Sequence, residues 1–196
     1  RNLTDNCEPV DFSYIKNQIN DGLGSRAKKI LDNIEEEPIA SASLAQVHKL
    51  KLGDKDLVIK VQKPGLLNLI DRDISALHLG IKLLRFIYKG YPRVNLENLL
   101  NSYEKVIKNE LDFRIEAASA KKTFENFDGS QLLYVPKIED EFTTKRILVM
   151  EYIDGIPITD IEELKEHNLN LKKLSENGVR IFLKQVFEDN FFHADM

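Results

Sequence analysis

The stretch VHKLKLGDKDLVIKVQ, residues 47–62, contains two extended runs on either side of a glycine turn. The runs VHKLKL and LVIKVQ are typical of β-strands, and Gly53-Asp54 supplies the residues that a tight turn needs. Pro64-Gly65 follows and ends the second run. This is the clearest β signal in the chain, and it predicts a β-hairpin.

Helical patterns lie on both sides of this hairpin. Before it, the sequence predicts two short helices over residues 12–22 and 26–34, the first capped by Asp11. After it, two longer helices are predicted over residues 66–88 and 96–127, separated by KGYPRVN with its glycine and proline. The second of these has one apolar stripe at helical spacing, formed by Ile107, Leu111, Ile115 and Ala118.

The remaining elements are a strand pair and further helices. QLLYVPKI and RILVMEYI, residues 131–138 and 146–153, read as two strands around the polar loop EDEFTT. From Thr159 the chain becomes helical, and Thr159 with Glu162 forms a capping box. The order of elements predicts an α+β protein in which a small sheet carries a helix and is followed by a more helical portion.

Composition narrows the class of protein. The chain has 196 residues, 28 basic and 32 acidic, with a formal charge of −4 and both signs mixed along its length. A nucleic-acid partner is not expected, because phosphate-binding faces leave a basic excess. Cys7 is the single cysteine, which excludes an intrachain disulfide and a cysteine-based zinc site. Residues 66–87 contain five charges, so this apolar stretch predicts a core helix rather than a transmembrane segment.

Two charged motifs have both a structural and a functional interpretation. Lys60, inside LVIKV, is either an edge lysine that discourages aggregation or a cation that reaches from a strand to a bound anion. In NELDFRIEAASA, residues 109–120, Asp112 and Glu116 are four residues apart, and Glu110 and Arg114 have the same spacing. The acids form either a solvated face or a group held by cations from elsewhere, for which Lys60 is the candidate.

Two further stretches carry weaker signals. PIASASLAQV, residues 38–47, is half alanine and serine, which permits either tight packing or a close approach of backbone and hydroxyl groups to phosphate oxygens. FFHAD, residues 191–195, is either the end of a domain or a His-x-Asp in which the aspartate orients a hydroxyl as a base. The sequence order of small-residue loop, strand lysine, helix glutamate, strand ending in MEY and His-x-Asp is the order of the parts in a protein kinase.

Longer motifs make the resemblance specific. The stretches PIASASLAQVH, VIKVQKPG, NELDFRIEAASA, VMEYIDGIPI and FFHADM resemble the UbiB family of atypical kinase-like proteins, also called the AarF-domain family. The likeness runs from about Asp11 to Met196 and is greatest to bacterial members that serve ubiquinone biosynthesis. It implies a protein-kinase-like N-terminal lobe with a small antiparallel sheet and the first helices of a C-terminal lobe. The implied boundaries are a helical extension at 1–37, the nucleotide-binding lobe at 38–153 and the start of the helical lobe at 154–196.

The resemblance also assigns roles to individual residues. It implies that Lys60 contacts nucleotide phosphates and pairs with Glu116, that Glu110 and Asp112 form a family acidic motif, and that Asp195 is the catalytic aspartate with His193 as its companion. An alanine-rich nucleotide loop is implied at Ile39, Ala40, Ser41, Ala42, Ser43, Leu44, Ala45, Gln46 and Val47. A hinge beside the adenine is implied at Met150, Glu151 and Ile153.

Several expectations follow for the whole protein. ATP or ADP is the expected ligand, with magnesium ligands expected beyond Met196, where the family has His-Pro-Gly-Asn and Asp-x-Gly. The family's Lys-x-Gly-Gln motif is missing as well, so the resemblance implies a truncated and catalytically silent piece. It implies ubiquinone-synthesis enzymes and membrane lipid as partners, and the cytoplasmic side of a bacterial inner membrane as the location. The alternatives are a non-catalytic nucleotide- or lipid-responsive scaffold and a small-molecule kinase of the aminoglycoside or choline type.

Overall fold

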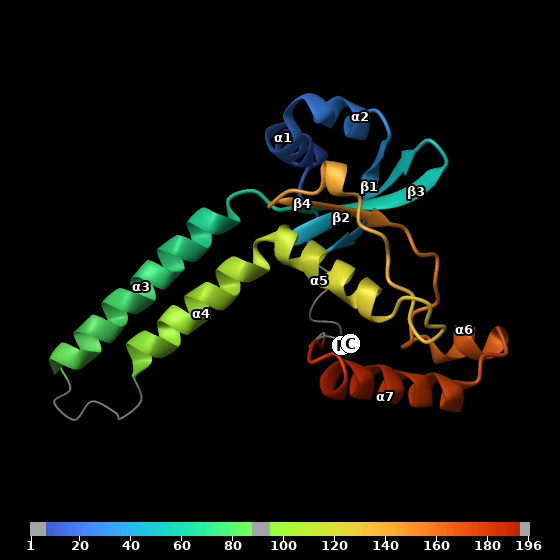
Figure 1. Ribbon diagram of the computed structural model, residues 1–196. Coiled ribbons are helices and arrows are strands. Elements are labelled where there is room, and N and C mark those ends of the chain that lie inside the picture. Colours follow the sequence, from blue (N-terminus) through green and yellow to red (C-terminus); the bar gives the residue numbers. More distant parts are fainter. Residues whose placement is uncertain (1–6, 88–94, 193–196) are drawn as a thin grey trace. The chain divides into compact units, whose positions relative to one another are not determined.

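The computed structural model describes residues 7–87 and 95–192 of the chain (Figure 1). Its centre is a four-stranded antiparallel sheet in the order β1-β2-β3-β4, formed by Ile34–Ser41, Ala45–Leu52, Lys55–Gln62 and Ile147–Glu151. The predicted hairpin at residues 47–62 is present as β2 and β3, whose turn contains Gly53 with a φ of 63°. The α+β class predicted from the sequence is confirmed.

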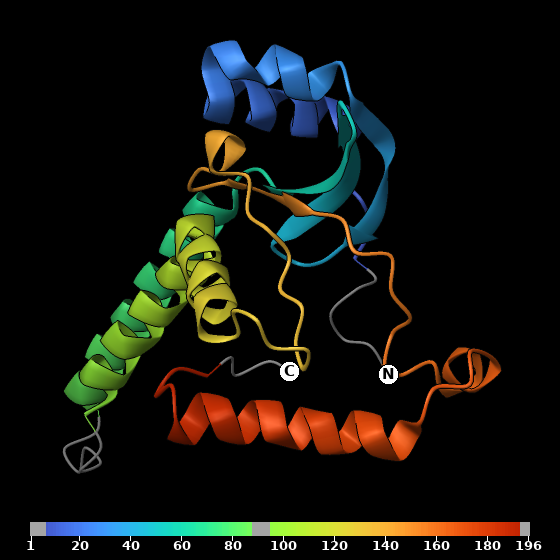
Figure 2. The same cartoon turned by 45° about the vertical axis from the view of Figure 1, so that its right-hand side comes forward.

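Helices cover both faces of the sheet (Figures 1 and 2). On one face, α1 (Phe12–Leu23) and α2 (Ala27–Leu31) pack over a hydrophobic core, and the 3-10 turn η1 (Gly24–Arg26) connects them. On the other face lies the start of α5 (Phe113–Asn126). Residues of β3 alternate between the two faces, so that Leu57, Ile59 and Val61 enter the α1–α2 core.

The two N-terminal helices differ from the prediction at their ends. The Asp11 carboxylate caps α1 by accepting from the Ser13 N–H at 2.8 Å, as expected. However, α1 passes through Gly22 and ends at Leu23, before Gly24, which has a φ of 55°. The second helix ends at Leu31, earlier than predicted, because the chain enters β1 at Ile34. The strand β1, whose first half is acidic and exposed, was not predicted from the sequence.

The single helix predicted over residues 96–127 is wrong. The structure has two helices there, α4 (Leu96–Glu110) and α5, which are separated by Leu111 and Asp112. Leu111 is fully buried, and its carbonyl accepts from the buried Gln62 side chain of β3 at 3.1 Å. Because this tertiary contact fixes the chain at Leu111, the expected continuous apolar stripe is interrupted between Leu111 and Ile115.

The strand predicted over residues 131–138 is also absent. Only Ile138 forms a bridge, to Met150 of β4. Pro136 lacks an N–H donor, which opposes a continuous ladder at this point. The strand predicted over 146–153 is present as β4, and the 3-10 turn η2 (Asp140–Phe142) precedes it.

The chain divides into two compact units. The first contains the sheet, α1, α2, α3 (Leu66–Ile87), α4 and the start of α5 up to Ala117. The second contains Ala118–Lys137 and the residues after Glu151, including α6 (Ile161–Glu166) and α7 (Leu171–Phe187). The capping box predicted at Thr159 is wrong, since the Asp160 carboxylate caps α6 by accepting from the Glu163 N–H at 3.1 Å. Across residues 7–87 and 95–192, no helix is both long enough and apolar enough to cross a membrane.

Candidate functional site

The small-residue stretch forms a strand-turn-strand unit rather than a long loop. Its residues form the end of β1, the start of β2 and a short turn at 42–44, which is closed by the Ala42 N–H donating to the Ala45 carbonyl at 2.9 Å. Ser41, Ala45 and Gln46 are buried, so their side chains cannot contact a ligand on the surface. The other predicted loop residues are partly or fully exposed: Ile39, Ala40, Ala42, Ser43, Leu44 and Val47. The exposed part is therefore the turn together with Ile39, Ala40 and Val47.

The sheet register brings this unit into line with Lys60. Ala40 of β1 pairs with Val47 of β2, Val47 pairs with Lys60 of β3, and Lys60 pairs with Leu148 of β4. We call this set the Lys60 row. Directly paired residues of an antiparallel sheet point to the same face. Ala40 and Val47 of the small-residue unit therefore share one face of the sheet with the lysine, the face that α5 covers.

Glu116 of α5 lies over this row. The Lys60 Nζ donates to both carboxylate oxygens of Glu116, each at 2.9 Å. The Lys60 side chain is 29% exposed and the Glu116 side chain 41% exposed, so solvent still reaches both charges. The ammonium group also lies 5.0 Å from the ring centre of Phe113. The contact that the sequence suggested between strand lysine and helix acid is present, and the glutamate holds the lysine at an accessible point.

Phe113 fixes α5 against the sheet. It is 2% exposed and packs with Ala45, Ala117 and Leu148 in a second hydrophobic cluster. The Phe113 N–H donates to the Lys145 carbonyl at 3.0 Å, which ties the first residue of the helix to the segment before β4. Glu116 is one turn after Phe113 on the same helix face, so this packing sets the position of its carboxylate.

Asp112 caps α5 instead of forming part of a helical acidic face. Its carboxylate accepts from the Arg114 N–H at 3.1 Å and from two Arg114 guanidinium nitrogens at 2.9 and 2.6 Å. These side-chain hydrogen bonds lower the pKa of Asp112 from its ordinary value, although burial acts in the opposite direction. Arg114 thus pairs with Asp112, not with Glu110 as the spacing suggested. Glu110 is exposed at the last position of α4.

The other predicted site residues are placed as follows. Met150 of β4 is half-buried and packs against the Phe113 cluster, on the same sheet face as Lys60. Glu151, the last residue of β4, is half-buried as well. Ile153 belongs to the second unit and is 45% exposed. The predicted catalytic pair, His193 and Asp195, lies outside the described residues.

A buried polar network beneath the small-residue unit was not predicted. Gln46 and His48 are almost fully buried on the face that α1 covers, where the His48 ring lies 5.4 Å from that of Phe12. The His48 Nδ1 lies 2.8 Å from the Glu35 carbonyl, and its Nε2 lies 3.1 Å from the Gln46 amide nitrogen. A carbonyl only accepts, so Nδ1 carries the proton and Nε2 accepts from Gln46.

This network ties the chain before α1 to the sheet. The Gln46 side-chain oxygen accepts from the Val10 N–H at 2.9 Å, and the Cys7 N–H donates to the Ser41 carbonyl at 3.1 Å. Burial lowers the pKa of His48 from its ordinary value of 6.5, partly offset by the hydrogen bond to Glu35. The alternation of Gln46 and His48 in a strand was the signal that could have revealed a polar pair on one face.

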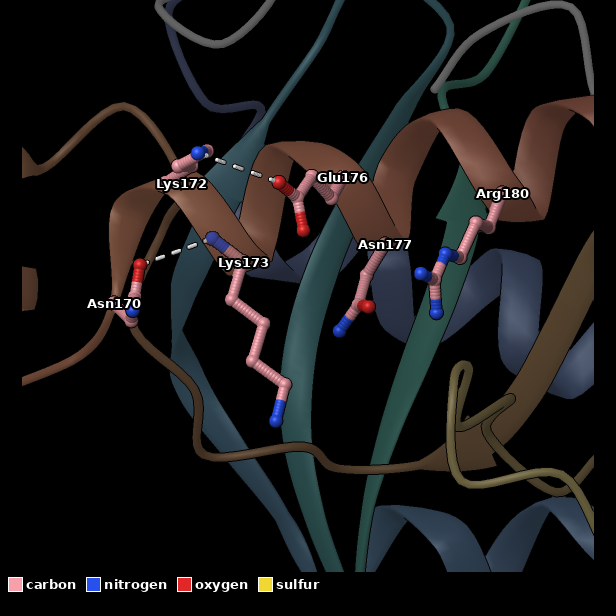
Figure 3. A pocket seen from close by; sticks show the side chains of 6 residues that line it. All are labelled: Asn170, Lys172, Lys173, Glu176, Asn177 and Arg180. Carbon is pink, nitrogen blue, oxygen red and sulfur yellow. Dashed lines mark hydrogen bonds and ion pairs between the residues drawn. The ribbon is translucent and has the colours of Figure 1, made fainter.

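Two other features do not add to this site. In the described part of the chain, no three His, Cys, Asp or Glu side chains come together as a metal-binding group. A recess of about 330 Å³ lies along the first half of α7 (Figure 3), lined by Asn170, Lys172, Lys173, Glu176, Asn177 and Arg180. All six belong to one helix and its cap, so the recess is a shallow space between side chains, and it contains none of the predicted site residues.

Comparison with known proteins agrees with the family resemblance of the sequence motifs. Residues 2–196 match the model of the ABC1 atypical kinase-like domain. The chain is 41% identical over 199 residues to the probable protein kinase UbiB of Histophilus somni and 42% identical over 196 residues to that of Azotobacter vinelandii. These alignments cover 99% of this chain but only 37% and 36% of the two relatives, so the chain spans little more than a third of their length.

A solved structure shares the fold. It is Rv3197 of Mycobacterium tuberculosis in complex with erythromycin, which superposes with a TM-score of 0.67 over 79% of this chain and 39% of that protein. The sequence identity is 23%, so this similarity concerns the fold alone.

Proposed function

The chain belongs to the ABC1 atypical kinase-like family, and from this premise we propose that it is the nucleotide-binding part of an atypical kinase or ATPase that supports ubiquinone biosynthesis. The observation that carries the proposal is the ion pair between Lys60 and Glu116, because it lies in line with the small-residue unit on one face of the sheet. The names of the relatives support the kinase assignment at the level of the family.

The residues of this site fit a nucleoside triphosphate. Lysine provides a compact charge on a long side chain, which suits a contact with phosphate oxygens. Glu116 holds the ammonium group in place, and the half-exposed pair remains accessible to a ligand. The turn at 42–44 has side chains that are small except for Leu44, so a phosphate group can approach the backbone N–H groups of Ser43 and Leu44, whereas that of Ala42 donates to the Ala45 carbonyl. ATP or ADP is accordingly the ligand that we propose.

Catalysis requires more than these residues. Phosphoryl transfer relies on metal ions that neutralise charge on the phosphates, and the described residues supply no group of metal ligands. We assign Asp195 as the base and His193 as its structural companion on the basis of the family motif. The proposal therefore places ATP binding in this 196-residue chain and expects no turnover by it alone, which a single-turnover ATPase measurement tests.

The location and the partners of the intact protein are part of the same proposal. By family resemblance it acts at the cytoplasmic side of a bacterial inner membrane, with membrane lipid and ubiquinone-synthesis enzymes as partners. A deletion strain decides whether catalysis is needed. If full-length variants Lys60→Ala and Asp195→Asn both restore ubiquinone, the protein is a scaffold, and if neither does, the kinase or ATPase assignment is supported.

Nucleotide binding by this chain is the direct test. We expect Lys60→Ala to weaken the binding of a fluorescent ATP analogue by at least about tenfold, since it removes a charge-assisted contact that contributes on the order of 1.5–3 kcal/mol. Lys55→Ala is the matched control, because Lys55 is on the same strand and pairs with Glu139 away from the Lys60 row. Equal affinity of the Lys60→Ala variant and the unmodified chain would refute the proposed site.

A further inference from the structure

Residues 7–10, the chain just before α1, are bound to the part of the sheet that carries the turn at 42–44. We call these two stretches the Val10 segment and the nucleotide turn. The Cys7 N–H donates to the carbonyl of Ser41, the residue before the nucleotide turn, at 3.1 Å. Val10 is partly buried and packs against the hydrophobic core that α1 and α2 cover. The Val10 segment therefore borders the turn that we propose to bind phosphate.

Lys63, the first residue after β3, connects the same two stretches. Its N–H donates to the Leu44 carbonyl of the nucleotide turn at 2.9 Å. Its ammonium group donates to the Glu8 carbonyl of the Val10 segment at 3.1 Å. The chain is thus held on one side of the nucleotide turn by the Val10 segment, at Ser41, and on the other side by Lys63, at Leu44. Release of the Val10 segment removes one of these two restraints.

The side-chain amide of Gln46 binds the Val10 segment to the sheet. Its oxygen accepts from the Val10 N–H at 2.9 Å, and its nitrogen lies 3.4 Å from the Val10 carbonyl and 3.1 Å from the His48 Nε2. The amide nitrogen has two N–H donors, so a single orientation of the amide satisfies all three contacts when Nε2 is unprotonated. Gln46 is 1% exposed, so water does not readily replace these partners.

A second proton on the His48 ring is incompatible with this orientation. Nδ1 already donates to the Glu35 carbonyl at 2.8 Å, so an added proton binds to Nε2. Nε2 then becomes a donor that faces the N–H donors of Gln46. Rotation of the amide brings its oxygen to Nε2, but the same rotation places the amide nitrogen against the Val10 N–H. The protonated ring and the two hydrogen bonds to Val10 therefore exclude each other.

The acceptor of the Nδ1 proton is a backbone carbonyl, which does not titrate. The elements packed around His48 also carry charged side chains, all of them exposed to solvent: Glu8 and Asp11 before α1, Lys16 of α1, and Glu35, Glu36 and Glu37 of β1. From β3, the residue paired with His48 is the fully buried Ile59. Burial lowers the pKa of His48 from its ordinary value of 6.5. The attached state is thus favoured above pH 6.5 and becomes less favourable as the pH falls below that value.

We propose that Gln46 is a positioning residue for the nucleotide turn, and that protonation of His48 decides whether it holds the Val10 segment. With a neutral ring, the amide holds the segment, which restrains the turn at the Ser41 carbonyl. With a protonated ring, the amide rotates and the segment is released. Nucleotide then binds more weakly, because binding must order a turn that is no longer restrained. This effect on nucleotide rests on the proposed function, whereas release of the segment does not.

The test is amide hydrogen exchange of the 196-residue chain, followed by NMR at about pH 7.5 and about pH 5.0. Protection factors correct for the pH dependence of the intrinsic exchange rate. The protection factor of the Val10 N–H should fall on the order of tenfold at the lower pH, the loss expected for two hydrogen bonds. The control is the N–H of Phe113 in α5, which donates to the Lys145 carbonyl and should change much less.

Two variants make the result specific. His48→Gln does not titrate and keeps an acceptor oxygen for the Gln46 amide, so the protection factor of the Val10 N–H should be the same at both pH values. Gln46→Leu removes the hydrogen bonds to Val10, so protection should be low at both. If protection of Val10 in the unmodified chain does not depend on pH, or falls equally in His48→Gln, the inference is wrong. Unchanged circular dichroism at about pH 7.5 shows that each variant is folded.

Nucleotide binding distinguishes this inference from the proposed function. At about pH 5.0 the unmodified chain should bind the fluorescent ATP analogue severalfold more weakly than His48→Gln, and titration of the nucleotide itself cancels in this comparison. Equal affinities, together with the expected loss of Val10 protection, would exclude the effect on the nucleotide turn. If neither protein binds the analogue at either pH, the proposed function fails, while the exchange measurement still decides whether His48 controls the Val10 segment.

Discussion

Replacing Phe113 by alanine tests whether α5 is held to the sheet by packing. Phe113 is 2% exposed between Ala45, Ala117 and Leu148, so the substitution removes a buried ring and leaves a cavity. Such substitutions cost about 3–5 kcal/mol. Loss of the Lys60 ammonium contact at 5.0 Å adds roughly 0.5–1 kcal/mol, because that group is partly solvated. The expected total of about 3.5–6 kcal/mol is a large part of the 5–15 kcal/mol that stabilises an ordinary domain.

The assay is a urea titration. The chain has no tryptophan, so unfolding is followed by far-ultraviolet circular dichroism. Phe124→Ala is the matched control, because Phe124 belongs to the same helix but is 40% exposed, and its loss should cost less than about 1.5 kcal/mol. Phe113→Leu should recover most of the stability, since it refills most of the cavity. If Phe113→Ala and Phe124→Ala destabilise the protein equally, the packing described for α5 is wrong.

Two further predictions concern a buried histidine and two glycines. Lowering the pH from about 7.5 to about 5.5 should reduce the free energy of unfolding, because the unfolded chain takes up a proton near pH 6.5 that the buried, neutral His48 resists. A His48→Gln variant should lack this part of the pH dependence in urea titrations at both pH values, and an unchanged profile would contradict it. Gly178→Ala in α7 should raise the melting temperature through about 0.5–1 kcal/mol of helix propensity, since its added Cβ meets open space. Gly22→Ala should lower it, because the new Cβ would lie 2.7 Å from a side-chain atom of the fully buried Ile147, and a gain at Gly22 would refute this packing.

The sequence predicted those parts of the fold that depend on local patterns. The hairpin of β2 and β3 follows from alternation and a glycine turn, and α3 begins at the predicted residue, Leu66. The break between α4 and α5 was missed, because it depends on the Gln62 side chain reaching the Leu111 carbonyl from 49 positions away. No local periodicity contains a contact of that kind.

The candidate site, like the fold, was predicted from the sequence only in part. Lys60 and Glu116 were identified from motif order, and the structure places their charged groups in contact. The capping role of Asp112 was not predicted, because the helix that its carboxylate caps cannot be separated from α4 by local periodicity. The exposure of individual side chains could not be predicted from the sequence either. Ser41 and Ser43 look equivalent in the sequence, but Ser41 is buried and Ser43 is exposed. Ser41 is the last residue of β1, whereas Ser43 lies in the turn between β1 and β2, outside the sheet.

The site at the Lys60 row depends on the exact register of β3. Side chains of a strand alternate between faces, so a shift of β3 by one residue would exchange Lys60 with Ile59, which is fully buried in the core beneath α1. The lysine would then enter that core, and an isoleucine would face Glu116. Inserting or deleting one residue within β3 is therefore expected to move the lysine to the opposite face of the sheet. Inserting or deleting two residues returns it to the face that bears the charge. Length changes are far better tolerated in the turn at Gly53-Asp54, where they leave the order of faces intact.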